Sequence, residues 1–492
     1  MSRRDVVALA LGILVTIGAA SDVGADATPT SGARAGRNEA APPGMDAPAG
    51  DAPAVVTLAG FLERVLAAHP TARAADLERD LGAAELLAAK GAFDPVLRSK
   101  TDFKQKDDRS KADRTDTVIE QPLPWLFGPR VYAGYRRNVG TNVDPEEVTP
   151  EDGEARVGVA LSLLQGVRTD RRRAALSKAE LRPELAEAVR RFEINNLVRA
   201  AAVEYSKWAE ATESLTIQEE LLALASTRAA FVEGRVAEGE AAPIEAVEAT
   251  QELARREGDV VQARRFLEQA AVDASVFLWT GAGAPRPLEG SPEPVPPPAA
   301  VERERIAAER AETERRRPEI TRARLALASA EIDAALADEL WWPSVEAFAE
   351  SIQPDLGAPD GDEFKVGFSI THPLWFRQQN AQRAIARVNA NRAWLQQLTA
   401  RRAVEADVER AIVGLERTLE RHGTVEREAA LARRLAEAER ERFDAGESSL
   451  LVVNLRERAA AEAATRLVNA KAEYLRAVIA YRWAVGTVAD WS

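Results

Sequence analysis

The sequence lacks cysteine and has few aromatic residues. None of its 492 residues is cysteine, and Phe, Trp and Tyr together make up 5%. The missing thiols exclude disulfides, thiolate zinc sites, cysteine nucleophiles and a lipidated N-terminal cysteine. Ala, Arg, Glu and Leu dominate instead. This mixture favours long helices and coiled-coil packing over compact α/β cores.

The chain also lacks an excess of basic residues. It has 78 acidic and 65 basic side chains, which gives a formal net charge of −13. Such a surface repels a nucleic-acid backbone, and no basic stripe interleaved with aromatic residues counteracts that repulsion. The sequence therefore predicts no nucleic-acid binding.

Motifs of catalysis and of cofactor or metal binding are absent from the sequence. The three histidines, His69, His372 and His422, are far apart and show no ligand spacing such as HExxH. We expect each of them to pack or cap locally. No GxSxG elbow or glycine-rich phosphate loop is present. We therefore predict no enzyme activity, no cofactor and no metal.

Long apolar runs are missing except at the N-terminus. Arg3 and Arg4 precede an apolar run from Val6 to Ala20, and small residues follow, with a plausible cleavage site at residues 23–25. This pattern predicts a secretory signal peptide over residues 1–25. A single membrane anchor is the alternative, although the run is short for a bilayer span. If the mature chain enters a membrane, we expect it to do so as β-strands.

Proline-rich stretches divide the rest of the chain. Residues 26–54 are rich in Ala, Pro and Gly without a hydrophobic period, which predicts a flexible leader. Residues 281–300 are denser still in proline, and a helix cannot continue through them. They predict a linker between a first repeat, 55–280, and a second repeat, 301–492.

The two repeats share landmarks in the same order. Pro70 and Pro95 bracket a helical run in the first, and Pro318 and Pro343 bracket a run of the same length in the second. Later, RVAEGE in the first repeat corresponds to RFDAGE in the second. Several matches in one order indicate an internal duplication. The first pair of landmarks repeats at an offset of 248 residues and the second at 207, so the first repeat holds about 41 additional residues between them. We assign these to an inserted β hairpin or excursion near residues 107–153.

Long helices are expected in both repeats. The stretches 168–237 and 377–445 contain little glycine and much Ala, Leu, Glu and Arg. A continuous helix of roughly 70 residues extends about 105 Å, and its apolar stripe must pack against other long helices. A shorter helix follows each, over about 243–279 and 450–483.

Each repeat also contains a small strand-forming section. Phe364, Val366, Phe368 and Ile370 alternate with polar or small residues, and 343–352 is their expected partner. In the first repeat 157–163 alternates similarly, with the polar segment 96–106 as its expected partner. The sequence thus predicts about four main strands.

With these elements the chain resembles the TolC-like outer-membrane efflux protein family, also called outer membrane factors. The shared features are the signal, the proline-rich gap, and in each repeat a helix, strands, a very long helix, an RxxxG turn and a returning helix. The resemblance extends from Val55 to the C-terminus. It implies a mainly α fold in which three copies assemble, with long antiparallel helices forming an α-barrel. It also implies that each copy supplies four strands to a shared 12-stranded β-barrel.

The resemblance places the RxxxG turns at the periplasmic tips of the helices. Family members carry a small residue after the glycine and then an acidic residue before a leucine. The first turn matches at Gly239, Ala242 and Glu245, whereas Val452 takes the acidic position in the second. The expected tip residues are Arg235, Gly239, Glu240, Glu245, Arg442, Gly446 and Glu447.

Two interpretations of the charged residues near these turns stay open. Six carboxylates tripled by symmetry can narrow the periplasmic mouth and favour cations, or they can be solvated helix ends. Arg235 and Arg442 can form ion pairs between helices or stabilise helix C-termini through the helix dipole. The six acidic residues are Glu233, Glu238, Glu240, Glu245, Asp444 and Glu447.

Tryptophans gather where helices are expected to meet strands in the second repeat. Trp341 and Trp342 precede Pro343, and Trp375 follows the last expected strand. Tryptophan is favoured at a lipid–water boundary. Ordinary packing at a helix-to-strand junction explains the same cluster equally well.

The resemblance implies a passive exit duct in the outer membrane, with most of the chain in the periplasm. It would belong to a tripartite efflux or type I secretion system. The expected partners are two further copies of the chain, a periplasmic adaptor protein and an inner-membrane transporter. The alternative is a periplasmic helical scaffold or adaptor that forms no channel.

Overall fold

The computed structural model describes residues 55–106, 109–140, 148–299, 302–353 and 363–491. The predicted signal peptide, 1–25, and flexible leader, 26–54, lie outside these residues. Among the described helices, none has a segment that is both long enough and apolar enough to cross a membrane.

Helices make up most of the described chain, and four of them are long. The long helices are α5 (Arg182–Ala237), α6 (Pro243–Ser275), α9 (Arg377–Asp444) and α10 (Leu450–Val485). The shorter ones are α2 (Leu58–Ala68), α3 (Pro70–Lys90), the 3₁₀ turn η1 (Gly91–Phe93), α4 (Arg171–Glu180), α7 (Arg303–Arg316) and α8 (Pro318–Glu339).

Prolines mark where several helices begin. Pro70, Pro243 and Pro318 stand in the first turn of α3, α6 and α8, where the missing N–H has no intrahelical partner to lose. Pro183 does the same for α5. It interrupts the continuous helix predicted over 168–237, because the chain forms α4, turns at Leu181 and starts again. The prediction of one long helix over 377–445 agrees with α9.

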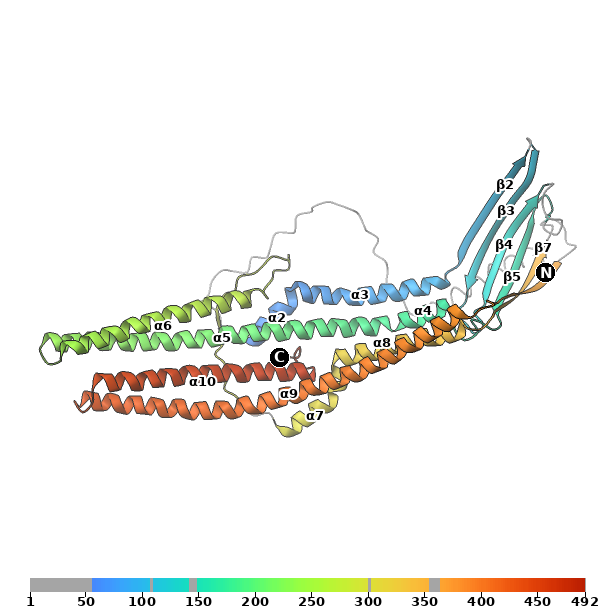
Figure 1. The fold of residues 1–492 in the computed structure, drawn as a ribbon. Coiled ribbons are helices and arrows are strands. Elements are labelled where there is room, and N and C mark those ends of the chain that lie inside the picture. Colours follow the sequence, from blue (N-terminus) through green and yellow to red (C-terminus); the bar gives the residue numbers. More distant parts are fainter. Residues whose placement is uncertain (1–54, 107–108, 141–147, 300–301, 354–362, 492) are drawn as a thin grey trace. The chain divides into compact units, whose positions relative to one another are not determined.

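The helices of each half pack in the same way. In the first half α3 and α6 both lie against α5, and in the second α8 and α10 both lie against α9. The halves meet mainly where α5 packs on α10 (Figure 1). Helices of this length bury their apolar stripes only against one another.

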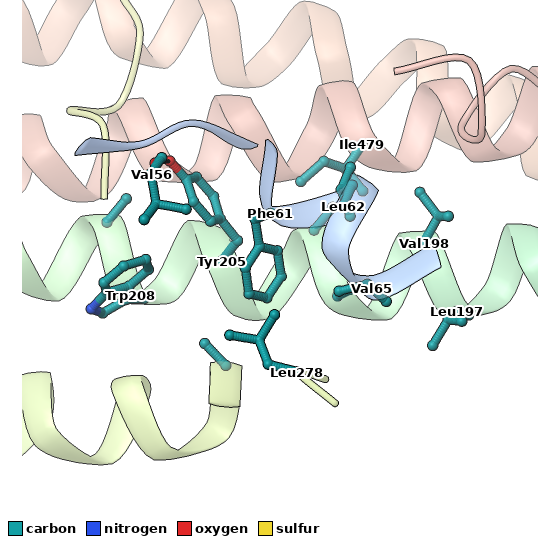
Figure 2. Packing of buried hydrophobic residues seen from close by; sticks show 14 of the residues in the cluster. Val56, Phe61, Leu62, Val65, Leu197, Val198, Tyr205, Trp208, Leu278 and Ile479 are labelled. Atoms are coloured by element: carbon teal, nitrogen blue, oxygen red, sulfur yellow. Dashed lines mark hydrogen bonds between the residues drawn. The ribbon is translucent and has the colours of Figure 1, made fainter. Parts of the chain in front are cut away.

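The largest apolar cluster lies where α2, α5 and α10 meet the segment after α6 (Figure 2). Phe61 and Val65 of α2 are fully buried against α5, and Ile479 of α10 closes the cluster from the other half. The Tyr205 hydroxyl donates to the carbonyl of Val56 at 2.6 Å and accepts from the Glu293 N–H at 3.1 Å. Burial raises the pKa of Tyr205 to about 12, so this hydroxyl stays protonated and keeps donating.

That bond attaches two short strands to the cluster. Strand β1 (Val55–Val56) pairs in parallel with β6 (Ser291–Pro292). Strand β6 belongs to the proline-rich segment predicted as a linker, and the nearby Val295 is buried in the same cluster. The segment between the repeats therefore contributes to the core.

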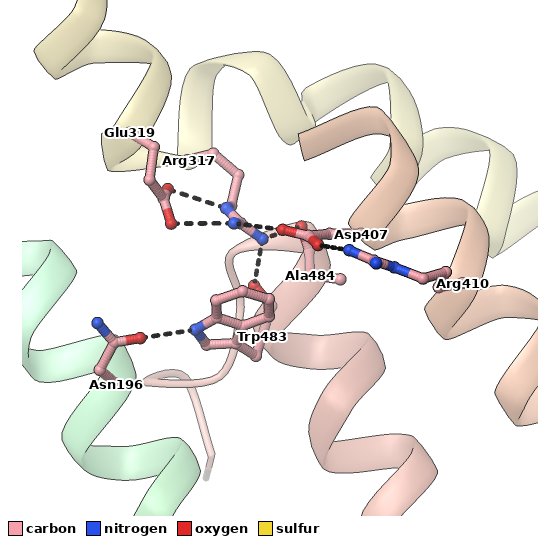
Figure 3. A network of polar contacts seen from close by, with 7 residues as sticks. All are labelled: Asn196, Arg317, Glu319, Asp407, Arg410, Trp483 and Ala484. Atoms are coloured by element: carbon pink, nitrogen blue, oxygen red, sulfur yellow. Dashed lines mark hydrogen bonds and ion pairs between the residues drawn. The ribbon is translucent and has the colours of Figure 1, made fainter. Parts of the chain in front are cut away.

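A buried guanidinium joins the two helix pairs (Figure 3). Arg317, 2% exposed, makes two bonds of 2.9 Å to Glu319 and one of 3.2 Å to Asp407 of α9. It also donates to the carbonyl of Ala484 at 3.0 Å. Its Cζ lies 4.2 Å from the centre of the Trp483 ring. The Trp483 indole in turn donates to Asn196 of α5 at 3.1 Å, so one arginine connects α8, α9, α10 and, through this ring, α5.

The first half has a histidine in the corresponding position. His69 precedes Pro70 as Arg317 precedes Pro318, and its ring lies 6.1 Å from that of Trp279 and 6.0 Å from that of Phe277. His69 Nδ1 accepts from the Thr71 N–H at 3.1 Å and so caps α3. Burial lowers the pKa of His69, which agrees with an unprotonated acceptor nitrogen.

Six strands form a single antiparallel sheet in the order β2-β3-β4-β5-β7-β8. In the first half η1 leads into β2, and in the second α8 leads into β7 (Figure 1). The strands are β2 (Val96–Lys106), β3 (Arg109–Pro122), β4 (Arg130–Val139), β5 (Glu154–Ser162), β7 (Ser344–Gln353) and β8 (Glu363–Thr371).

The sheet corrects two expectations about the strands. Within the described residues this sheet has six strands, where about four main strands were expected, because the hairpin predicted near residues 107–153 forms β3 and β4, which join the sheet between β2 and β5. Strand β2 consequently pairs with β3, and not with β5. Strands β3 and β4 carry charged residues at alternate positions, which makes each of them resemble a polar loop in the sequence. In the folded sheet the charges are paired with residues on neighbouring strands. The expected pairing of β7 with β8 is confirmed.

We predict that Arg317→Leu destabilises the chain by about 3–5 kcal/mol, because it leaves Glu319 and Asp407 without their buried partner. Arg317→Lys retains the charge but loses the two-pronged geometry, so its effect should be smaller. The measurement is urea unfolding followed by far-ultraviolet circular dichroism. The control is Arg315→Leu, whose side chain is 82% exposed and should shift the midpoint little. Equal midpoints for Arg317→Leu and Arg315→Leu would refute the structural role of this network.

We predict that His69 makes stability fall between pH 7 and pH 5. Its folded pKa is lowered, so below about 6.5, the ordinary value, the unfolded chain binds a proton that the folded chain does not. Stability contributed by the neutral ring is thus complete above that value and is lost as the pH falls. His69→Asn keeps a capping side chain without the titration. Urea midpoints at the two pH values should differ less for this variant than for the unaltered chain, and an unchanged difference contradicts the assignment.

Candidate functional site: a two-faced sheet and two helix turns

Cross-strand register assigns every residue of the sheet to one of two faces. Successive side chains of a strand alternate between faces, and directly opposed residues of neighbouring strands share one. Phe368 of β8 opposes Ala347 of β7, which opposes Leu161 of β5. Following such pairs across all six strands gives two sets of residues of different character.

One set, termed here the neutral face, contains no charged side chain over most of its length. Among the strand residues whose side chains are described, only the pair Asp113–Arg137, at 2.7 Å, brings charge to this face, and it does so at one end. Its large side chains are exposed, as in Phe103 (77%) and Phe364 (73%). The neutral face comprises Leu97, Ser99, Thr101 and Phe103 of β2; Thr115, Thr117, Ile119 and Gln121 of β3; Val131, Ala133 and Tyr135 of β4; Ala155, Val157, Val159 and Leu161 of β5; Val345, Ala347, Ala349 and Ser351 of β7; and Phe364, Val366, Phe368 and Ile370 of β8.

The other set, termed here the charged face, carries ionisable residues on every strand. Apart from Asp113 and Arg137, the charged residues of the first-half strands whose side chains are described lie on this face. The residues are Arg98, Lys100, Asp102 and Lys104 of β2; Arg114, Asp116 and Glu120 of β3; Arg130 and Arg136 of β4; Glu154 and Arg156 of β5; Glu346 and Glu350 of β7; and Glu363 and Lys365 of β8.

Ion pairs on the charged face reach over intervening strands. Arg156 of β5 contacts Asp116 of β3 at 2.6 Å, passing the position of Gly134 on β4. Arg130 of β4 likewise contacts Glu346 of β7 across β5. A small residue on the strand between leaves room for the long side chain to lie across it. These pairs connect the inserted strands β3 and β4 with β5 and β7.

Two aromatic rings on the charged face lie directly over glycines. A Cβ added to Gly158 would come within 2.4 Å of the Tyr132 ring, and one added to Gly367 within 2.4 Å of the Phe348 ring. Each ring and its glycine are direct cross-strand partners. Only glycine fits these positions, and the Tyr132 hydroxyl then donates to Glu350 at 2.9 Å.

The turn between β3 and β4 is attached to α4 by a buried arginine. Arg173, 8% exposed, donates to the carbonyl of Trp125 at 2.9 Å and to that of Val167 at 3.1 Å. Phe127 has a positive φ of 67°, and its N–H donates to the same Val167 carbonyl at 3.0 Å. Arg173 was not predictable from the sequence, because nothing in the pattern of α4 separates it from the neighbouring Arg171 and Arg172.

Aromatic residues flank the sheet where it meets the helices. Trp341 stacks on Phe376 at 5.4 Å and donates to Asn380 at 3.0 Å, so it packs at the junction. Trp342 and Trp375 are 52% and 74% exposed. The turn between β3 and β4 adds Trp125, 56% exposed, which was not among the predicted interface aromatics. The membrane-interface role of these tryptophans stays a prediction.

The two helix turns have the same backbone geometry. Gly239 and Gly446 have φ of 76° and 79°. The N–H after each glycine bonds to the carbonyl five residues earlier, Glu240 to Arg235 at 2.9 Å and Glu447 to Arg442 at 2.8 Å. This is a Schellman motif, in which glycine takes the left-handed position at no steric cost.

The structure brings the two turns together. Val232 of α5, Ala249 of α6 and Leu450 of α10 form a small buried cluster just behind them. Arg235 and Arg442 each donate back to the carbonyl of the residue that follows the glycine, at 3.3 and 3.4 Å. Within the described chain both arginines therefore contact their own turns.

The acidic residues of the turns are mostly exposed. Glu245 is half-buried and accepts from the Ala242 N–H at 3.4 Å, so it caps α6. The expected aperture role of these residues stays a prediction. The exposed members are Glu233, Glu238, Glu240, Asp444 and Glu447.

Further along the helices, a buried carboxylate connects three of them. Glu457 of α10 receives both guanidinium nitrogens of Arg228 from α5, and Arg440 of α9 at 2.6 Å. Burial by itself would raise the pKa of Glu457, but its two arginine partners outweigh that effect and keep the pKa below the usual value. This cluster was also not predictable from the sequence, because its members come from three different helices.

No group of three or more His, Asp or Glu side chains among the described residues is arranged to hold a metal ion. His69, His372 and His422 lie in separate elements of the structure. His372 packs its ring against Phe376 at 4.8 Å.

Comparison with known proteins gives a family and a fold. A family model described as outer membrane efflux protein matches residues 310–487. A comparison with curated protein sequences found no match. Among solved structures, the outer-membrane channel OprN has 19% identity and a TM-score of 0.61, over 87% of this chain and 90% of that one.

Two further structures give similar values. The outer membrane protein VceC from Vibrio cholerae has 15% identity and a TM-score of 0.61, over 87% of this chain and 96% of that one. The MtrE outer membrane channel from Neisseria gonorrhoeae, in its open state, has 15% identity and a TM-score of 0.62, over 87% and 88%. Residues 310–487 are therefore identified as an outer membrane efflux protein domain, and the described residues of the chain have the fold of outer-membrane channels.

Proposed function

We propose that the chain forms a passive exit channel of the outer membrane in a tripartite efflux or type I secretion system. The observation that carries this proposal is the two-faced sheet, which continues into long paired helices. A sheet with one uncharged, exposed face and one charged face suits a wall between lipid and water. The outer membrane efflux family to which residues 310–487 belong supports the same conclusion.

The neutral face is the part that contacts lipid. A charged group in the middle of a bilayer is costly, and the neutral face has charge only at one end. The charged face then borders the aqueous path, where water and cross-strand partners stabilise its ionised groups. Trp125, Trp342 and Trp375, at the helical end of the sheet, lie at the depth where indole rings favour the membrane boundary.

The helices form the periplasmic part of the duct. Helices α5 and α9 contain 56 and 68 residues, which correspond to about 84 and 102 Å. The hydrocarbon core of a bilayer is only about 30 Å thick. Most of the chain therefore lies in the periplasm, where the helices continue the path away from the sheet.

The working assembly is a homotrimer with two kinds of partner. One sheet cannot surround an aqueous path, so several copies must combine. A periplasmic adaptor protein and an inner-membrane transporter dock at the turns around Gly239 and Gly446, and the transporter supplies the energy. The channel itself carries out no chemistry, and its partners select the cargo.

A periplasmic scaffold without a channel is the competing function. The polar first-half strands favoured it at the level of sequence. In the folded chain those charges lie on one face, apart from the Asp113–Arg137 pair at one end, and the neutral face continues through β2, β3 and β4. A scaffold surrounded by water has no need of such a face.

We expect the mature protein to be extracted from outer membranes as a trimer in mild detergent and to conduct ions in a planar bilayer.

Substitutions in strand β8 test lipid contact by the neutral face directly. Phe368→Arg should cost about 2–4 kcal/mol near the bilayer midplane and deplete the protein from the outer-membrane fraction. Ser369→Arg is the matched control, because this neighbour on the same strand belongs to the charged face.

The measurement is the amount of each variant in fractionated envelopes, with the oligomeric mass of the extracted protein. Equal incorporation of the two variants would contradict lipid contact by the neutral face. A protein recovered without detergent from the periplasm, as monomer or dimer, would favour the scaffold.

Neutralising the acidic residues of the turns decides between their two interpretations. We expect the combined variant Glu233→Gln, Glu238→Gln, Glu240→Gln, Asp444→Asn and Glu447→Gln to leave the cation selectivity of the trimer unchanged. These carboxylates are exposed, and salt screens them over about 8 Å at physiological ionic strength. Reversal potentials in a salt gradient provide the measurement. A lower cation preference in the variant would establish the carboxylate aperture instead.

A further inference from the structure

The six-stranded sheet ends in two edges, β2 and β8. Within the described chain, each of these strands pairs with a neighbour on one side only. Phe103 of β2 and Phe364 of β8 expose 77% and 73% of their surface, as edge residues do when nothing covers them. Unpaired edges with apolar side chains are sites for pairing with another chain.

Strand direction shows which edges fit together. Every neighbouring pair in the sheet is antiparallel, so with six strands β2 and β8 run in opposite directions. If β8 of one copy lies beside β2 of the next, that junction is also antiparallel. The alternation then continues without a break, which an odd number of strands would not allow.

The faces also continue across that junction. Leu97 and Phe103 of β2 belong to the neutral face, as do Val366 and Phe368 of β8. Pairing β8 with β2 of another copy therefore joins neutral face to neutral face and charged face to charged face. A second copy of this chain is thus the partner that the edges fit.

The inserted strands are an integral part of the sheet. Arg156 on β5 reaches Asp116 on β3, and Arg173 of α4 holds the turn between β3 and β4. Strand β3 pairs along nearly its whole length with β2 on one side and β4 on the other. Each copy therefore brings six strands to the assembly.

We propose that three copies close their sheets, β8 of each against β2 of the next, into one cylinder of 18 strands. This inference rests on the proposed trimeric channel and deepens it. The diameter of a closed sheet grows roughly in proportion to the number of strands. The cylinder is therefore about 1.5 times as wide as the 12-stranded one that four strands per copy would form, and the charged face lines its interior.

Disulfide crosslinking tests the junction, since the chain contains no cysteine of its own. The double variant Ser99→Cys, Val366→Cys places one thiol on β2 and one on β8, both on the neutral face. The related pair Thr101→Cys, Val366→Cys samples a second register. After oxidation of outer membranes, at least one of these variants should give covalent dimers and trimers in a denaturing gel.

Two further variants serve as controls. Ser99→Cys, Thr117→Cys joins direct cross-strand partners whose hydroxyls lie 2.8 Å apart, so it should crosslink within one chain and report oxidation. Ala133→Cys, Val366→Cys places a thiol on β4. In the 18-stranded arrangement β4 is three strands from β8 of the next copy, or about 14 Å. That exceeds the roughly 7 Å that a disulfide can bridge.

The outcomes separate this inference from the proposed function. Covalent trimers from a β2–β8 pair and none from the β4–β8 pair support the 18-stranded cylinder. Covalent trimers from the β4–β8 pair would overturn it, because β2 and β3 would then lie outside a closed sheet of 12 strands while the trimeric channel stands. A protein that crosslinks only within the chain and is monomeric in detergent would overturn the proposed channel and this inference with it.

Discussion

In an antiparallel sheet, a side chain and its direct cross-strand partner lie on the same face, and the described sheet depends on this constraint. Local alternation in each strand is modest, and in β3 it mixes threonines with acidic and basic residues. The register of the strands aligns the neutral residues of each strand with those of its neighbours. Six weakly alternating strands thereby form one neutral and one charged face. A slip of one residue in any pair would place charged side chains among the apolar ones. The ion pairs that cross β4 and β5 oppose such a slip, because they fit one register only.

The helical part obeys a different constraint, which is that long apolar stripes must be covered by other helices. Helix α5 covers α3 and α6, α9 covers α8 and α10, and the halves join where α5 meets α10. Arg317 and His69 occupy corresponding positions in the two halves. Arg317 packs on Trp483 at the end of α10, and His69 packs near Trp279, which follows α6. Arg317 is charged and has several partners, whereas His69 is neutral and caps α3. The two predicted repeats thus share the arrangement of these sites, whereas the chemistry at the two positions differs.

Much of this plan was predictable because it depends on neighbours in the chain. Proline starts a helix, and glycine at a left-handed position ends one, wherever the chain carries them. The turns at Gly239 and Gly446 and the extent of α9 therefore agree with the expectations. The interruption at Leu181 follows from Pro183, which the assumption of one continuous helix ignored. Strands β3 and β4 were expected only as an inserted hairpin or excursion, and their place in the sheet was not predicted, because a strand with charged residues at alternate positions is indistinguishable from a polar loop until its partners are known.

The candidate site divides in the same way. By itself, the sequence determined the order of helices in the two predicted repeats, the glycine turns and the positions of the tryptophans beside β7 and β8. These features follow from local backbone preferences and spacing. Only the tertiary structure decided which face each charged strand residue occupies, where the inserted strands join, and which buried partners Arg173, Arg317 and Glu457 find. Those outcomes depend on contacts between residues far apart in the chain. Strands β5 and β7, which come from different halves, become neighbours only when the whole chain has folded.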